Sequence, residues 1–305
     1  MKRATPLKLM IAVAVLMILT ACAGQPTPDS GRIPVVATTS ILADIVSQVG
    51  GDHLSVTTLV PPGSNEHEYQ PAPRDIAAVS DAALIFEVGL GLEEFMATIV
   101  ENAGTQVNPI TVSEGIQTRE FSGEGDDHLS ADPHVWLDPA NVVIWVQNIE
   151  SALAGYDPAH ADAYHENSRA YIAQLNELDA WIAQQTAGIP AENRRLVTDH
   201  MLFGYFAEKY GFEVIGAVIP SYSAMAQPSA QQLAQLEDAI RQYGVKVILV
   251  GNTVNPALAN RIAADTGIEL VPFYTGSLSE PTGPAPTYLD YMRYNVSVIV
   301  DALAK

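Results

Sequence analysis

Three histidines of this sequence, His67, His134 and His200, each lie at a break that follows an apolar segment or within a rigid turn. A neutral imidazole is the commonest metal ligand among side chains. Three imidazoles together with one oxygen ligand form a tetrahedral site that suits zinc, and other divalent metals also fit. The pattern therefore indicates a metal site. The alternative from the same residues is that each ring is only hydrogen-bonded within a packed loop.

Residues 132–139 enclose His134 between two Asp-Pro pairs. Each proline fixes its own φ and disfavours helix in the residue before it, so His134 is predicted to lie in a rigid, non-helical turn. A helix can begin at the second proline. Asp132, Asp138 and Asp199 are candidates to accept a hydrogen bond from the second ring nitrogen of a ligand histidine.

Short apolar, β-branched runs alternate with segments of helical periodicity from residue 33 onward. This alternation predicts βαβ units and mainly parallel sheets. Ligands of such sheets bind beyond the carboxyl ends of the strands, where His67 and His200 are expected. Residues 159–186 contain neither proline nor glycine, and their apolar side chains recur at helical spacing. They predict one helix of about 40 Å, long enough to connect two lobes.

The length of 305 residues allows two domains. We therefore expect an α/β protein of two lobes, each a mainly parallel sheet flanked by helices. The N-terminal lobe is expected over residues 33–156, the linker helix over 157–188 and the C-terminal lobe over 189–305. His160 and His165, which lie on the predicted linker helix, are interpreted as surface or packing residues.

The first 21 residues resemble a lipoprotein signal peptide. Basic residues accompany an apolar run over 7–20, which is too short for a comfortable membrane span and ends in Leu-Thr-Ala-Cys, a lipobox pattern. Cys22 is the only cysteine, which excludes an intrachain disulfide and a cysteine-based zinc site. Residues 22–32 have the composition of a flexible linker between a lipidated Cys22 and the folded body.

The formal net charge of −20 argues against nucleic acid or an anionic membrane surface as a partner. The acidic residues of 121–131, with His128 among them, predict either a solvated loop or a segment that collects cations, and we favour the solvated loop.

The chain resembles the zinc- and manganese-binding receptors of bacterial ABC importers, the TroA-like or ZnuA-like family. The resemblance rests on the lipobox and on four segments in the same order along nearly all of the chain: 61–69, 132–139, 198–206 and 287–295. It implies two α/β lobes joined by one long helix, with the metal between them and with His67, His134 and His200 as ligands. It also implies an extracytoplasmic receptor, lipid-anchored at Cys22, that delivers its metal to the importer permease and is not an enzyme. We expect it to act as a monomer.

The fourth ligand departs from the family pattern. Many members carry an aspartate just before a serine, at the position where this sequence has Gly276. Glu66, a bound water and Glu280, in that order, are the candidates to replace it. The resemblance also implies zinc rather than manganese, because His200 stands where manganese-type members have a carboxylate and because the aspartate is missing. A manganese-specific receptor of the same type remains the alternative.

Two other functions fit parts of the sequence. His67-Glu68 begins like the His-Glu-x-x-His motif of zinc hydrolases, but Pro71 stands where the second histidine is required. A surface adhesin could hold metal only for structure, and its folding would then depend on the metal.

Overall fold

The computed structural model describes residues 31–120, 131–224 and 226–304. The predicted signal peptide, Cys22 and the acidic loop with His128 lie outside the described residues. Residues Ile33–Lys305 form one compact unit. In the described ranges no helix combines the length and the apolar character that crossing a membrane requires.

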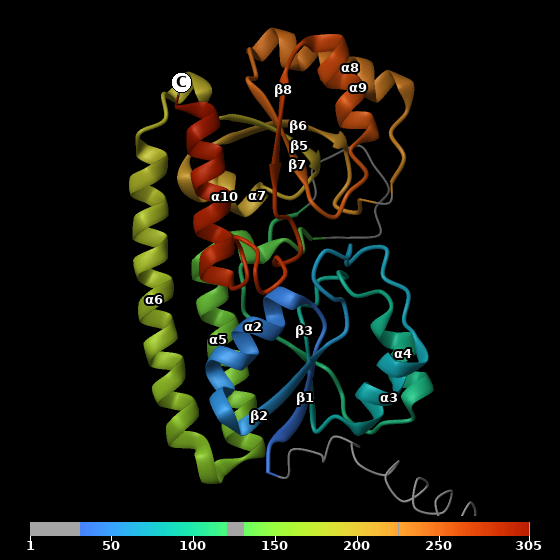
Figure 1. Ribbon diagram of the computed structural model, residues 1–305, viewed down its shortest axis with the longest axis vertical. Coiled ribbons are helices and arrows are strands. Elements are labelled where there is room, and N and C mark those ends of the chain that lie inside the picture. The colour runs from blue at the N-terminus through green and yellow to red at the C-terminus, as the bar shows by residue number, and fades with distance from the viewer. Residues whose placement is uncertain (1–30, 121–130, 225, 305) are drawn as a thin grey trace, which may run out of the picture. The chain divides into compact units, whose positions relative to one another are not determined.

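β1 lies inside the first sheet, and the strands of this sheet run parallel in the order β2-β1-β3-β4 (Figure 1). These strands are β1 (Ile33–Ala37), β2 (Leu54–Thr58), β3 (Leu84–Glu87) and β4 (Ile110–Thr111). The helices on its two faces are α2 (Ser40–Gly50) with α5 (Pro139–Tyr156), and α3 (Pro73–Asp81) with α4 (Met96–Ala103). Because successive side chains of a strand point to opposite faces, Val35 and Ala37 pack with α2 and α5, whereas Val36 packs with α3 and α4.

The second sheet repeats this plan in the parallel order β6-β5-β7-β8. Its strands are β5 (Arg195–His200), β6 (Glu213–Ile219), β7 (Val247–Gly251) and β8 (Glu269–Phe273). Its helices are α7 (Gly204–Tyr210) with α10 (Tyr288–Leu303), and α8 (Ala230–Tyr243) with α9 (Ala257–Thr266). Leu249 of β7 packs in the core that contains α7 and α10, and its neighbour Ile248 packs with α8 and α9. β1 of the first sheet and β7 of the second sheet are therefore covered by helices on both faces.

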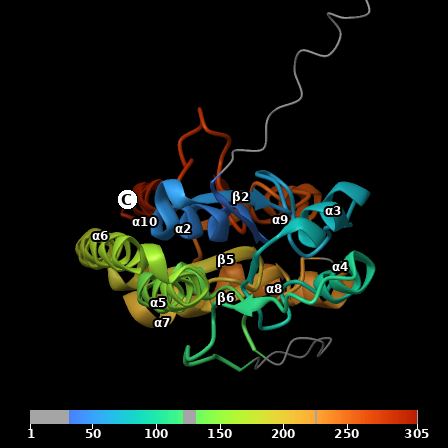
Figure 2. The same ribbon diagram turned by 90° about the horizontal axis from the view of Figure 1, so that it is seen from below.

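One long helix carries the chain from the first sheet to the second. This helix, α6 (Ala161–Ala187), has 27 residues and lies beside α5 in both views (Figures 1 and 2). Its predicted apolar stripe, which includes Tyr171, Leu175 and Leu178, is buried. The prediction of two parallel sheets flanked by helices and joined by a long helix is confirmed.

The start of α6 differs from the expected bounds of 157–188, because the helix begins only at Ala161. A 3₁₀ turn, Pro158–His160, precedes the helix. The Asp157 carboxylate bonds to the His160 ring at 2.7 Å and accepts a hydrogen bond from the Tyr164 hydroxyl at 2.8 Å. Because its carboxylate makes these two contacts, Asp157 stabilises the 3₁₀ turn and does not cap α6.

A buried carboxylate holds the carboxyl ends of β1 and β3 together. Glu93 accepts hydrogen bonds from the Thr38 hydroxyl at 2.6 Å and from the backbone N–H groups of Val88 and Gly89 at 2.8 and 2.9 Å. Burial raises the pKa of Glu93 from 4.5 to about 7, although these three hydrogen bonds act to lower it.

This raised pKa predicts how stability depends on pH. Between pH 4.5 and about 7 the folded state holds the Glu93 proton more firmly than the unfolded state does, so the free energy of unfolding falls as pH rises. Compared with Glu93→Gln, the free energy of unfolding of the metal-free protein is expected to fall by about 2.5 kcal/mol more between pH 5 and pH 8. Urea unfolding across this range measures the loss. Glu166→Gln, at an exposed position, is the control. A pH-independent difference between the wild type and Glu93→Gln would contradict the prediction.

Candidate metal centre

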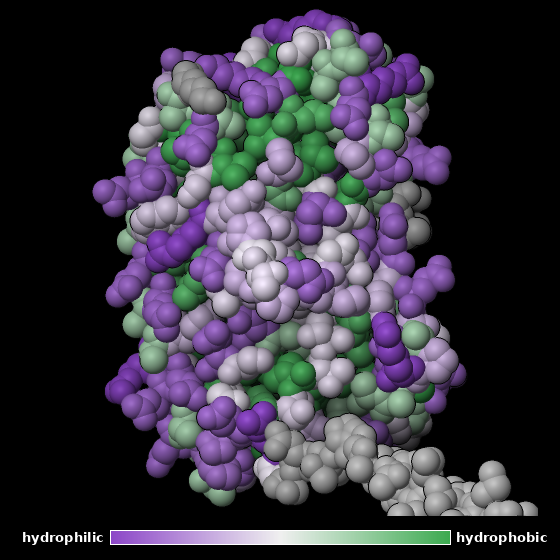
Figure 3. Space-filling model, viewed as in Figure 1, coloured by the Kyte–Doolittle hydropathy of each residue, from purple (hydrophilic) through white to green (hydrophobic). Residues whose placement is uncertain are grey.

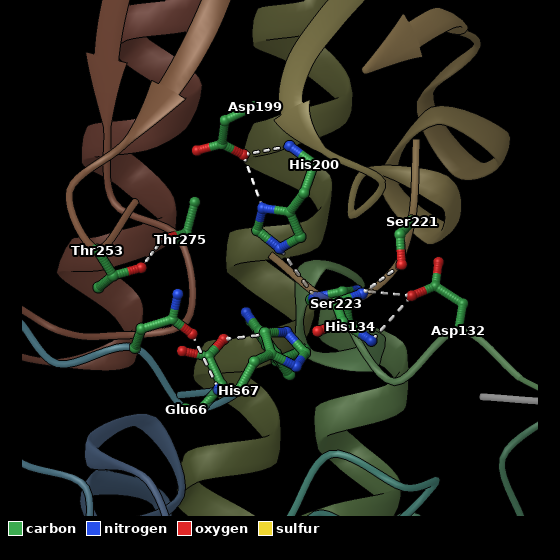
Figure 4. A network of polar contacts seen from close by, with 12 residues as sticks. Glu66, His67, Asp132, His134, Asp199, His200, Ser221, Ser223, Thr253 and Thr275 are labelled. Atoms are coloured by element: carbon green, nitrogen blue, oxygen red, sulfur yellow. Dashed lines mark hydrogen bonds and ion pairs between the residues drawn. The ribbon is translucent and has the colours of Figure 1, made fainter. Parts of the chain in front are cut away.

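The three histidines come from three different elements of the fold. His67 lies in the loop after β2, His134 directly precedes the 3₁₀ turn Val135–Leu137 before α5, and His200 is the last residue of β5. The sequence predicted His200 just after a shorter strand, and the structure extends β5 to include it. Figure 4 shows the three rings turned toward one another.

One ligand atom from each of the three rings lies within 4.8 Å of the other two, and no other such group of metal-ligating residues occurs in the part of the chain that the structure describes. The ring centroids of His134 and His200 are 5.1 Å apart, and His67 lies 5.6 and 5.8 Å from them. The side chains of His67, His134 and His200 are 5%, 1% and 2% exposed. A cation held by all three rings would be shielded from solvent.

An aspartate orients each of two rings. Asp132 Oδ1 accepts from the backbone N–H of His134 at 3.0 Å and contacts its ring Nδ1 at 2.9 Å. Asp199 Oδ1 does the same for His200 at 2.6 and 2.8 Å. A proton on each Nδ1 satisfies these contacts and leaves Nε2 to face the centre of the site. Asp138, the third candidate, instead caps α5 through the Ala140 N–H at 2.7 Å.

The two aspartates differ in what their second oxygens contact. Asp199 Oδ2 accepts a hydrogen bond from the Gly251 N–H at 2.6 Å, whereas Asp132 Oδ2 is buried without a hydrogen-bond partner. In Asp199→Asn, the amide N–H₂ group that replaces Oδ2 would face the Gly251 N–H, so two donors would oppose each other. In Asp132→Asn, the amide N–H₂ group can replace Oδ2, which has no hydrogen-bond partner, and no two donors are opposed. We therefore expect Asp199→Asn to destabilise the metal-free protein by about 1–3 kcal/mol, and more than Asp132→Asn does. Urea unfolding of both variants measures this order, and equal losses would contradict it.

Burial sets the protonation of the rings. It lowers the pKa of His67 and of His134 well below the usual value, and the neighbouring rings add to this effect. Burial also acts to lower the pKa of His200, but Asp199, with Glu66 and Asp132, raises it overall. The Nε2 atoms of His200 and His134 lie 3.3 Å apart, so a second proton on His200 can be shared between them. A metal ion bound by both nitrogens would replace that proton.

Glu66 fills the space that Gly276 leaves. A Cβ atom at position 276 would overlap the Glu66 carboxylate. Glu66 is 3% exposed, and its Oε1 lies 4.0 Å from His67 Nε2. Both Glu66 Oε2 and His67 Nε2 are buried without a hydrogen-bond partner, as expected of donors arranged for a cation. Burial raises the pKa of Glu66. Glu280 is exposed and is not a member of the histidine group.

Sequence reasoning missed two residues that support the site. Tyr222 places its ring 6.2 Å from that of His134, and nothing in the sequence around it indicates this role. Gly251 donates to Asp199, and a Cβ there would overlap Thr275. A signal for Gly251 was available, because a glycine that ends an apolar strand often marks a close approach of another segment.

Comparison with known proteins identifies the family to which the chain is similar. The family model described as ZnuA, "Zinc-uptake complex component A periplasmic", matches residues 35–302. The manganese-binding lipoprotein MntA of Halalkalibacterium halodurans is 33% identical over 299 residues, which cover 97% of each chain. The iron-binding protein YfeA of Yersinia pestis is 33% identical over 305 residues, 99% of this chain and 96% of YfeA. The solved structure of the periplasmic zinc-binding protein TroA from Treponema pallidum matches with a TM-score of 0.82 at 26% identity, covering 90% of this chain and all of that one.

The family match spans nearly the whole folded unit, and both relatives match over nearly their full lengths. The resemblance of the chain to this family is thereby confirmed. The chain is an extracytoplasmic, lipid-anchored metal-binding receptor of an ABC importer and not an enzyme, and it belongs to the ZnuA family.

Proposed function

We propose that this receptor captures Zn²⁺ in preference to Mn²⁺, with His67, His134, His200 and Glu66 as its ligands. The observation that carries the proposal is the meeting of three imidazoles beside a buried carboxylate. Three nitrogens and one oxygen form the donor set of many tetrahedral zinc sites, whereas manganese favours more oxygen ligands. Glu66 ranks above Glu280 because only Glu66 is buried next to a ligand histidine.

The two lobes have different parts in this proposal. Residues 33–156 supply His67 and His134, and residues 189–305 supply His200. A relative movement of the lobes, joined by the helix of residues 157–188, would separate His200 from the other two rings. Such a separation offers a route by which the metal leaves for the permease.

The proposal also includes a lipid anchor on Cys22. A lipid on Cys22 would leave only residues 22–32 between the membrane and β1. A fully extended linker of this length reaches at most about 40 Å, so the receptor would stay close to the membrane that holds the permease.

Competition between metals tests the proposal. The folded unit begins at Ile33, so the mature protein can be studied without its lipid. Zinc is expected to displace bound manganese when both are present at equal concentration, as measured by the metal content after gel filtration. Manganese is the second candidate, because MntA is named as a manganese-binding lipoprotein. Retention of manganese against zinc would overturn the zinc preference.

A further inference from the structure

The segment that connects β8 to α10, residues 274–287, attaches the second half of the chain to the first. It lies beside α2 in both ribbon views (Figures 1 and 2). Glu280 and Pro281 of this segment are exposed. The middle of the face drawn in Figure 3 is mostly pale, without a large hydrophobic patch. Three backbone N–H groups form hydrogen bonds between this region and residues of the first lobe: Gly63 to Ser277 Oγ at 2.6 Å, Leu278 to Ser40 Oγ at 3.0 Å, and Tyr288 to Asp44 Oδ2 at 2.8 Å.

The first of these hydrogen bonds reaches the loop that carries His67. Gly63 lies four residues before His67 and adopts a φ of 79°, which a residue with a side chain rarely adopts. Ser277 is 1% exposed, accepts from the Gly63 N–H and contacts the Leu278 carbonyl at 2.9 Å, where its hydroxyl donates. The residue before Ser277 is Gly276, which makes room for Glu66. Two consecutive residues of the segment thus contact the loop at Gly63 and at Glu66.

His67 depends on its loop more than the other two histidines do. His134 and His200 each have a ring nitrogen held by an aspartate. For His67, the hydrogen bond found among the described residues joins its backbone N–H to Asn65 Oδ1 at 2.9 Å. Its ring Nε2 has no hydrogen-bond partner and lies 4.0 Å from Glu66 Oε1. The position of the His67 ring is therefore set by the backbone of the loop and by packing.

We propose that Ser277 is a positioning residue that holds the His67 loop in its metal-binding place and thereby slows release of the metal. The proposal rests on the assignment of His67 as a ligand. Without the Ser277 hydroxyl, the Gly63 N–H loses its acceptor, and the loop can carry His67 away from His134 and His200. Dissociation requires this movement, whereas the first encounter with the metal does not, so the effect falls on the dissociation rate.

Ser277→Ala and Ser279→Ala form a matched pair for the test. Ser279 is a buried serine of the same segment, but its hydroxyl bonds within the segment, accepting from the Ala285 N–H at 3.0 Å and donating to the Glu280 carbonyl at 2.9 Å. Zn²⁺ dissociation from the mature protein is followed by stopped flow with a fluorescent chelator. We expect Ser277→Ala to release zinc about tenfold faster with an association rate within about twofold of the wild type, and Ser279→Ala to change neither rate by more than about twofold.

Two further measurements separate positioning from a general loss of structure. Ser277→Thr restores a hydroxyl and is expected to recover most of the slow release. Thermal unfolding of the metal-free Ser277→Ala variant is expected to match that of Ser279→Ala. Equal zinc release from the two alanine variants would overturn the role of Ser277 while leaving the metal site intact, and so would faster release that Ser277→Thr does not reverse. A wild-type protein that binds neither zinc nor manganese would overturn the proposed function itself.

Discussion

His200→Ala is expected to lower zinc affinity by at least about 100-fold, the largest effect of any substitution that we expect. Changes to groups that merely support a ligand typically reduce metal affinity by about 10–100-fold, and removal of the ligand itself should cost at least as much. His200 is also the proposed ligand that the second sheet supplies, as the last residue of β5. Its loss would remove the metal-mediated link between the lobes as well as one donor. Competition against a chelator of known affinity measures the change.

The control for this experiment is a histidine outside the site. His165 is exposed and pairs with Glu150 at 2.9 Å, so His165→Ala should leave zinc affinity unchanged. His67→Ala and His134→Ala are expected to weaken binding in the same direction as His200→Ala. A loss of less than about threefold in any of the three variants would remove that histidine from the proposed ligand set.

Gly276→Ala is expected to lower zinc affinity by about tenfold or more, although the substitution adds only one methyl group. The new Cβ would overlap the Glu66 carboxylate, which must then leave its place beside His67. The effect therefore acts through Glu66. Glu66→Gln should weaken binding similarly, and the double variant should bind about as well as Glu66→Gln alone, because the second change removes nothing further. Isothermal titration with zinc provides the four affinities of this cycle.

Gly155→Ala is the matched control for a glycine substitution. Gly155 lies in α5, and a Cβ there would meet no atom within 4 Å. It should bind zinc as the wild type does and should be at least as stable, because alanine favours helix more than glycine does. Additive losses in the cycle of Gly276 and Glu66 would show that the two residues act separately, and would contradict the idea that Glu66 replaces the ligand missing at position 276.

The contact between Glu66 and Gly276 is a feature that local sequence does not encode. From the sequence, Glu66, a bound water and Glu280, in that order, are the candidates for the fourth ligand. Packing distinguishes Glu66 from Glu280. Gly276, in the second half of the chain, makes room for Glu66, which is in the first half, whereas Glu280 is exposed to solvent. Such a contact joins residues about 200 positions apart, and no local pattern encodes it.

The three aspartates near the histidines also have roles that only the tertiary structure distinguishes. Asp132, Asp138 and Asp199 were equivalent candidates in the sequence, since each lies within a few residues of a candidate ligand. The structure assigns Asp132 to His134 and Asp199 to His200, while Asp138 caps α5 and pairs with Lys209 at 2.5 Å. The direction in which a carboxylate points depends on the turn that carries it, and small differences in backbone angles decide it.

By itself the sequence determined the order of strands and helices, the long helix between the sheets, the family and the three candidate histidines. It could do so because strands, helices and proline-bounded turns depend on neighbouring residues, whose periodicity can be read directly. Only the tertiary structure decided that His67, His134 and His200 meet, that Glu66 lies over Gly276, and that Ser277 accepts a hydrogen bond from Gly63 in the loop of His67. These contacts join segments that are distant in the chain, and they form because the two sheets bury their apolar faces around α5, α6 and α10, which brings the segments together.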